Sequence, residues 1–128
     1  MTGDAPGKSL LDYFAIGYFA NFVHEQADWK IESFDFTRDL KLADEKTGQA
    51  LNALDTNLKP FAARGGKLIL YHGWNDPAIP GLATIAYFDD VRHLLGKKTV
   101  DDSIRLYMVP GMRHCGGGPG ATVFGQSD

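Results

Sequence analysis

Apolar residues in the first part of the chain recur at intervals of three and four positions. The pattern extends from about Ser9 to Glu25, and its members are Leu11, Phe14, Ala15, Tyr18, Phe19, Phe22 and Val23. Residues at this spacing share one face of a helix, so an amphipathic α-helix is predicted here. The apolar face is rich in aromatic side chains and therefore needs a surface to pack against.

A second, more polar helix is predicted further along the N-terminal half. The regular pattern breaks over residues 28–36, where an extended linker is expected. Helical character returns from Thr37 to about Gly48, and Asp39 near its start suits the positive end of the helix dipole. Pro60 and the glycines that follow it are expected to interrupt regular structure before the next element.

The C-terminal half holds the most regular pattern, two short apolar runs with a helical repeat between them. The runs, at about residues 67–72 and 103–109, end at glycine or proline and are typical of buried strands in a parallel sheet. The repeat at residues 82–95 has the spacing of a helix and stops at Gly96. Strand, helix and strand in this order form a parallel βαβ unit with a right-handed crossover. We therefore expect an α/β fold in which this unit is preceded by helices.

Composition narrows the class of protein. The chain has 128 residues, the size of one domain, and its 44% hydrophobic and 23% charged residues are ordinary for a globular protein. A net charge of -3 gives no electrostatic reason to expect nucleic acid or an anionic membrane as a partner. No apolar run reaches the roughly 18 residues that a spanning helix needs, and the polar N-terminal stretch lacks the apolar region of a signal peptide.

The candidate chemistry lies on the two loops that follow the predicted strands. In open α/β sheets, functional groups collect at the carboxyl ends of the strands, where Asp76 and His114 are expected. Neighbouring strands lie about 5 Å apart, so the two loops can touch. A carboxylate beside an imidazole fixes its tautomer and stabilises the imidazolium that forms when the other nitrogen takes a proton. Asp followed by His, after an earlier serine, is the order in which α/β-hydrolases carry their catalytic triad.

The serine that would complete such a triad is not found in the sequence. A nucleophile of this kind sits in a Gly-x-Ser-x-Gly turn upstream of the acid and the base. The chain has four serines, and none of them has glycine two positions away on both sides: Ser9, Ser33, Ser103 and Ser127. The sequence therefore predicts two members of a triad, with the nucleophile missing.

Two stretches closely resemble the C-terminal catalytic region of the tannase and feruloyl esterase family. They are GGKLILYHGWNDP at residues 65–77 and PGMRHCGGGPG at residues 110–120, and the likeness extends more weakly back to about Tyr13. The resemblance implies an α/β-hydrolase fold with a lid domain, and cleavage of esters of aromatic acids such as ferulate or gallate. It also implies that Asp76 is the acid and His114 the base of a Ser-Asp-His triad.

The same resemblance assigns a role to the single cysteine. Family members join a cysteine beside the serine to one beside the histidine, and Cys115 matches the second, with its partner outside this chain. Without the resemblance, Cys115 is more simply a buried thiol. The resemblance further implies a secreted or periplasmic enzyme, of which residues 1–128 are a fragment of one catalytic domain. The lid domain and the nucleophile region would lie outside this fragment, so the fragment alone is expected to be inactive.

Two other functions remain open. The chain could be a non-catalytic binding domain, or a metal-binding module that uses His72, Asp76, His114 and Cys115, although that spacing matches no common zinc pattern. We interpret His72 as a hydrogen-bonding residue of the turn and Trp74 as a packing residue. The glycines of residues 116–120 predict a flexible loop.

No cofactor is expected, and a small aromatic ester is the expected partner of the full-length enzyme. The isolated fragment is expected to be marginally stable or to self-associate. The reason is that a two-stranded sheet leaves exposed edges and the aromatic helix face lacks a cover.

Overall fold

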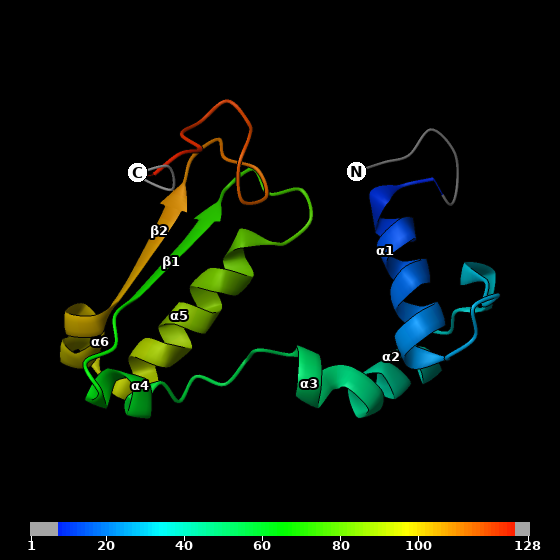
Figure 1. Ribbon diagram of the computed structural model, residues 1–128, viewed down its shortest axis with the longest axis horizontal. Helices are drawn as coiled ribbons and strands as arrows, with labels where there is room; N and C mark the ends of the chain where they lie inside the picture. The colour runs from blue at the N-terminus through cyan, green and yellow to red at the C-terminus, as the bar shows by residue number, and fades with distance from the viewer. Residues whose placement is uncertain (1–7, 125–128) are drawn as a thin grey trace. The chain divides into compact units, whose positions relative to one another are not determined.

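The computed structural model describes residues 8–124, which fall into two compact units (Figure 1). The chain divides between Ala53 and Leu54. The first unit is helical, and the second contains a parallel sheet of two strands with helices. Within the described residues, no helix is long and apolar enough to cross a membrane.

The first predicted helix is present, with a different geometry in its last turn. Helix α1 (Leu10–Tyr18) begins after Ser9, whose hydroxyl accepts a hydrogen bond from the Asp12 backbone at 3.0 Å while the Asp12 carboxylate accepts one from the Ser9 backbone. This reciprocal cap fixes the start of the helix. The chain then widens into a π-helical turn, Phe19–Val23, and leaves the helix before Glu25, whose φ is +56°. The predicted end at Glu25 is therefore two residues too late.

The aromatic face of this helix finds its partner within the first unit. The buried core consists of Phe19, Ala20, Val23, Trp29 and Ala43. The ring of Phe19 stacks on Trp29 at 5.6 Å and meets Phe34 edge-on at 4.8 Å between centroids. The wider π-helical turn directs three of these core side chains inward. Phe14 and Phe22 remain more than half exposed.

The second predicted helix is divided into three segments. They are α2 (Arg38–Ala43), a π-helical turn at Asp44–Gly48 and α3 (Gln49–Leu51), and a short 3₁₀ turn, Ile31–Ser33, interrupts the stretch predicted to be extended. Backbone groups of residues 37 and 38 donate to the carboxylate of Asp35, which caps the helix in place of Thr37.

Asp39 does more than interact with the helix dipole, because its buried carboxylate forms an ion pair with Arg38. Its side chain is fully buried, and two nitrogens of Arg38 donate to its carboxylate at 2.6 and 2.8 Å. The Arg38 hydrogen bonds outweigh the cost of burial and hold the pKa of Asp39 well below its usual range. The Asp35 backbone also donates to this carboxylate at 2.9 Å, so the buried Asp39 anchors α2 to the preceding turn.

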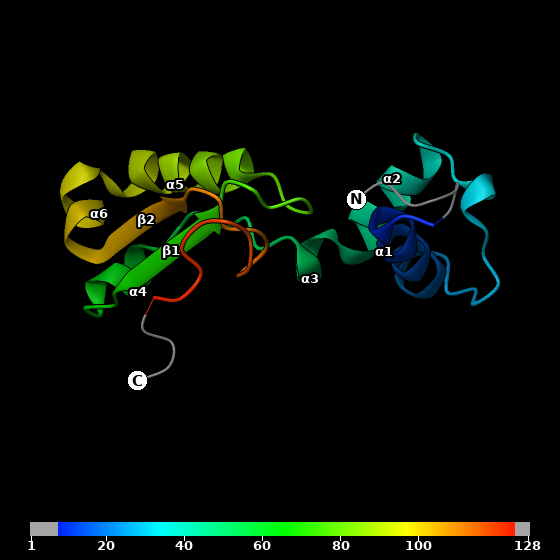
Figure 2. The ribbon, with the colours of Figure 1, turned by 90° about the horizontal axis from the view of Figure 1, so that it is seen from above.

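The second unit contains the predicted βαβ unit. Strands β1 (Leu68–Gly73) and β2 (Ile104–Val109) are parallel neighbours, paired from Leu68 with Ile104 to Gly73 with Val109. Helix α5 (Gly81–Leu95) connects them and lies along one face of the sheet (Figure 2). The prediction of a parallel α/β unit is confirmed, with β1 shifted by one residue from the expected range.

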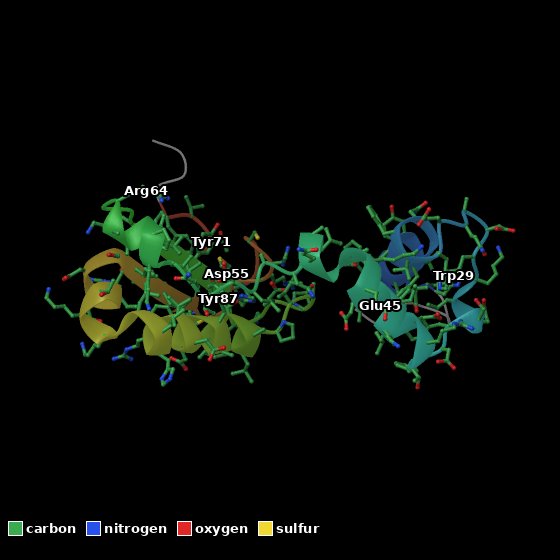
Figure 3. All side chains as sticks on the ribbon, turned by 90° about the horizontal axis from the view of Figure 1, so that it is seen from below. Trp29, Glu45, Asp55, Arg64, Tyr71 and Tyr87 are labelled. Atoms are coloured by element: carbon green, nitrogen blue, oxygen red, sulfur yellow. The ribbon has the colours of Figure 1, made fainter. Side chains whose placement is uncertain are left out.

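Two short helices of this unit were not predicted. Helix α4 (Lys59–Ala63) carries Pro60 in its first turn, where a missing backbone N–H costs nothing, so proline begins this helix instead of interrupting the chain. Helix α6 (Lys97–Ser103) is polar apart from buried Val100 and follows Gly96, whose φ of +81° ends α5. Figure 3 shows Tyr87 of α5 near Asp55. The hydroxyl of Tyr87 donates a hydrogen bond to the backbone carbonyl oxygen of Asp55 at 3.0 Å.

The two faces of the sheet differ. On one face, Val91, Val100 and Ile104 form a buried core with neighbouring residues of β1 and α5. The other face exposes Ile69, Tyr71 and Tyr107, which are 43–68% exposed. With Phe124, whose ring lies 5.7 Å from that of Tyr71, these residues line an apolar hollow of about 550 Å³.

Candidate active site

The loops that follow β1 and β2 lie side by side at the carboxyl end of the sheet (Figure 1). The backbone of Trp74 donates to the carbonyl of Val109, and that of Asn75 donates to the carbonyl of Met112, both at 3.0 Å. Gly73 lets the loops approach this closely, because a Cβ there would overlap the carbonyl oxygen of Met112. The expectation that the two loops touch is therefore confirmed.

Asp76 and His114 meet across these loops. Nδ1 of His114 lies 2.7 Å from Oδ2 of Asp76, although 38 positions separate the two residues in the sequence. The Asp76 side chain is 4% exposed, whereas that of His114 is 56% exposed. A buried acceptor thus holds an imidazole that remains open to incoming groups.

The carboxylate of Asp76 is fixed by its own turn as well as by His114. Its Oδ1 accepts hydrogen bonds from the backbone of Ala78 at 2.8 Å and of Ile79 at 3.0 Å. Burial raises the pKa of Asp76, but the backbone donors of Ile79 and Ala78 and the imidazole of His114 together outweigh it and lower the pKa to about 2. Asp76 is therefore ionised at neutral pH and can only accept hydrogen bonds.

The ionised carboxylate determines which ring nitrogen of His114 carries the proton. Because Oδ2 of Asp76 only accepts, Nδ1 of His114 must donate, so the proton of the neutral ring sits on Nδ1. Nε2 is then the unprotonated nitrogen that can take a proton from a nucleophile. The pair has the geometry of an orienting acid and a general base.

A hollow of about 410 Å³ opens beside the pair. Its wall includes His72, Asp76, Ile79, Thr84, His114 and Cys115. None of the described residues that line it is a serine. The arrangement can position a proton acceptor beside a bound group.

Cys115 lies next to the imidazole, at the surface. It is exposed, and it is the single cysteine of the sequence, so the chain has no internal disulfide. Its φ of +56° is a left-handed conformation, which is uncommon for a residue with a side chain. The interpretation of Cys115 as a buried thiol is therefore wrong, because the residue is exposed.

Three other sequence expectations can be compared with the structure. His72 forms hydrogen bonds, as predicted, with the carbonyl of Ile79 in the turn and with the hydroxyl of Thr84 in α5. Trp74 packs against Gly81 and is 48% exposed. The metal-binding alternative gains no support, because residues 8–124 contain no group of three or more His, Cys, Asp or Glu suited to a metal ion.

The glycine-rich loop after Cys115 folds back on its own start. The backbone of Arg113 donates to the carbonyl of Gly117 at 3.0 Å. Gly118 has a φ of +95°, and a Cβ there would overlap the carbonyl oxygen of Gly111. The glycines therefore allow the loop to fold back closely on its own start, which holds the segment that carries His114.

Thr84 is the residue of the site that sequence reasoning missed. It lies in the first turn of α5 and contributes its hydroxyl to the hydrogen bond with His72. In a βαβ unit the helix begins at the edge of the sheet where the first strand ends. A polar residue in that first turn is therefore a sequence signal that could have identified Thr84 as part of the site.

A parallel βαβ unit with an Asp–His pair at the carboxyl ends of its strands is the arrangement of an α/β-hydrolase. The family model described as tannase and feruloyl esterase matches residues 9–127. The chain belongs to the tannase and feruloyl esterase family, and its fold is part of an α/β-hydrolase fold.

Individual relatives agree with this family. An uncharacterized esterase of Xanthomonas campestris pv. campestris is 37% identical over an alignment of 128 positions, which covers 84% of this chain and 22% of that protein. Feruloyl esterase B of Aspergillus niger is 36% identical over 102 residues, 78% of this chain and 18% of that protein. The crystal structure of feruloyl esterase B from Aspergillus oryzae has a TM-score of 0.71 at 23% identity, with 88% of this chain and 24% of that one covered. The chain spans about a fifth of the length of these relatives.

Proposed function

We propose that this chain supplies the acid and the base of a serine esterase that cleaves esters of aromatic acids. The observation that carries the proposal is the 2.7 Å contact between a buried, ionised Asp76 and an exposed His114 at the carboxyl end of a parallel sheet. In this proposal Asp76 orients the imidazole and His114 carries the proton. The serine belongs to a part of the enzyme outside this sequence.

The reaction then follows from the position of Nε2. As the serine oxygen bonds to the ester carbonyl carbon, its proton passes to Nε2 of His114, and Asp76 stabilises the imidazolium. The imidazolium gives that proton to the alcohol oxygen as the ester C–O bond breaks, which leaves an acyl-serine. A water molecule then loses a proton to Nε2, attacks the acyl carbon and releases the free acid. The same proton returns to the serine.

The family supports a proposal for the substrate and for the cellular location of the full-length enzyme. Names such as feruloyl esterase B support a hydroxycinnamic or gallic acid as the acyl group, in a small ester. The exposed Cys115, adjacent to His114, supports a disulfide to a cysteine beside the serine. Such a bridge persists in oxidising surroundings, so we place the full-length enzyme outside the cytoplasm, secreted or periplasmic.

A chimera tests this proposal. In Aspergillus niger feruloyl esterase B, the matched stretch is replaced by the corresponding part of this chain, and kcat/KM is measured with methyl ferulate. We expect hydrolysis that falls by about 10⁴-fold or more in the His114→Ala chimera. The matched control is His93→Ala, an exposed histidine of α5, which should retain activity. An active chimera that tolerates His114→Ala would contradict the proposal, as would a folded chimera without activity.

The 128-residue chain alone is expected to show no appreciable hydrolysis of methyl ferulate, because acyl transfer needs the covalent nucleophile. A simple nitrophenyl ester, assayed in parallel, extends the test to an activated substrate. Turnover by the isolated chain that disappears in His114→Ala would indicate a nucleophile within this sequence and refute the placement of the serine.

A further inference from the structure

His72 occupies a place in the site that the proposed triad does not use. It is the residue before the last one of β1, its side chain is 10% exposed, and it lines the same hollow as Asp76 and His114. A histidine here could act as a second proton carrier, or it could hold other groups in place. Its hydrogen bonds distinguish these roles.

Both ring nitrogens of His72 are occupied by partners. Nε2 lies 3.1 Å from the carbonyl oxygen of Ile79, and Nδ1 lies 2.8 Å from Oγ1 of Thr84. A carbonyl oxygen only accepts, so Nε2 must carry a proton and donate it. In the neutral ring, Nδ1 then accepts the hydroxyl proton of Thr84. With its donor and its acceptor both engaged, the ring is suited to holding structure rather than to moving protons.

The residues that His72 holds also fix Asp76. The Ile79 backbone donates its N–H to Oδ1 of Asp76, and its carbonyl oxygen accepts the Nε2 proton of His72, so the backbone of one residue links both side chains. Nε2 of His72 also lies 3.4 Å from Oδ2 of Asp76, the oxygen that accepts from His114. The protonated Nε2 of His72 therefore lies near the same oxygen of Asp76 that accepts the hydrogen bond from His114.

We infer that His72 is a positioning residue that ties the turn of Asp76 to β1 and, through Thr84, to the start of α5. This inference rests on the proposed function, because it assigns His72 a role in orienting the Asp76–His114 pair. Without it, the carboxylate would be held only by the backbone donors of its own turn and by His114. Proton transfer depends steeply on orientation, and a displacement of about 1 Å can lower a rate by about 100-fold.

The inference is tested first on the chain itself by nitrogen-15 NMR of the histidine rings. Correlation through the carbon-bound ring protons reports the tautomer of His114. His72→Gln keeps a donor at the position of Nε2, whereas His72→Asn places its amide at the position of Nδ1 and loses that donor. Thr84→Val removes the hydroxyl and keeps the shape of the side chain. His93→Ala on α5 is the control, and the amide signals of β1 and β2 check that each variant is folded.

We expect wild type, His72→Gln and the control to keep the Nδ1-protonated tautomer of His114. His72→Asn should give a mixture of tautomers, and Thr84→Val should give a smaller change in the same direction. In the chimera, His72→Asn should lower kcat by about 10-fold to 100-fold with little change in KM. His72→Gln should restore most of the loss.

Two results would overturn the inference. One is a folded His72→Asn chain whose His114 tautomer is unchanged, and the other is equal damage by His72→Asn and His72→Gln. The tautomer is measured without any esterase activity, so it separates this inference from the proposed function. An inactive chimera contradicts the function, whereas an unchanged tautomer contradicts the role of His72.

Discussion

The carboxylate of Asp76 combines burial with a low pKa, which is uncommon unless several donors surround the group. Here two backbone N–H groups of its own turn and the imidazole of His114 offset the cost of burial. The sequence could predict that Asp76 and His114 meet, because parallel strands bring their following loops to one edge. The donors of Ala78 and Ile79 could not be predicted, since they depend on how the turn folds.

This low pKa predicts how the stability of the second unit depends on pH. The pKa of Asp76 falls from an ordinary 3.8 to about 2 on folding, so the unfolded chain binds the proton more tightly. The stabilisation is complete above about pH 4 and is lost as the pH falls through about 2. Urea unfolding between about pH 5 and pH 2 should show this loss, and Asp76→Asn should remove that part of the dependence. An equal loss of stability in the variant and the wild type would contradict this account of Asp76.

Among the secondary-structure elements, the sequence predicts those with a strong apolar periodicity. It misses the elements whose conformation depends on tertiary packing. Strands β1 and β2 and helix α5 have clear apolar patterns, and their places were predicted to within one or two residues. Helix α6 has a single fully buried residue, Val100, so its sequence gives too weak a period to identify. The π-helical turns at Phe19–Val23 and Asp44–Gly48 likewise have no sequence signal, because packing of the wider turn decides them.

Gly73, the last residue of β1, affects both the packing of the strand end and the geometry of the site. A Cβ at Gly73 would overlap the carbonyl oxygens of Met112 and Arg113, so Gly73→Ala must push the two loops apart. We expect a loss of about 1–3 kcal/mol in the free energy of unfolding, together with loss of the contact between Asp76 and His114. Denaturant unfolding and the NMR signals of the His114 ring check both parts.

Gly116→Ala is the matched control for this prediction. It lies in the loop after Cys115, and a Cβ there would meet no atom within 4 Å. Its stability and ring signals should therefore match those of the wild type. If Gly73→Ala is as stable as Gly116→Ala, the close approach of the loops is not what limits residue 73 to glycine.

At the scale of the whole molecule, the exposed face of the sheet is the feature that departs most from a typical α/β protein. Parallel sheets in such proteins are usually covered on both faces, whereas here Ile69, Tyr71 and Tyr107 are open to solvent. Sequence reasoning predicted exposed edges from the two-stranded sheet, but it did not identify which face would remain open. That required knowing on which side α5 packs.

This face predicts self-association of the isolated chain with a second copy. Sedimentation velocity over a range of concentrations should show dimers or larger species, since a contiguous apolar patch favours burial. Ile69→Thr with Tyr107→Thr keeps strand propensity and lowers the apolar area, so it should shift the chain toward monomer. Tyr13→Gln, an exposed residue of α1, serves as the control. Equal association of all three proteins would contradict the role of the sheet face.

A double-substitution cycle in the chimera tests whether Asp76 and His114 act as one catalytic unit, as we propose. The values of kcat/KM for methyl ferulate are compared among the parent chimera, Asp76→Asn, His114→Ala and the double variant. Groups that act together give losses that do not multiply. We expect the double variant to be no less active than His114→Ala alone. If the two losses multiply in the double variant, Asp76 and His114 act independently and do not form one catalytic unit.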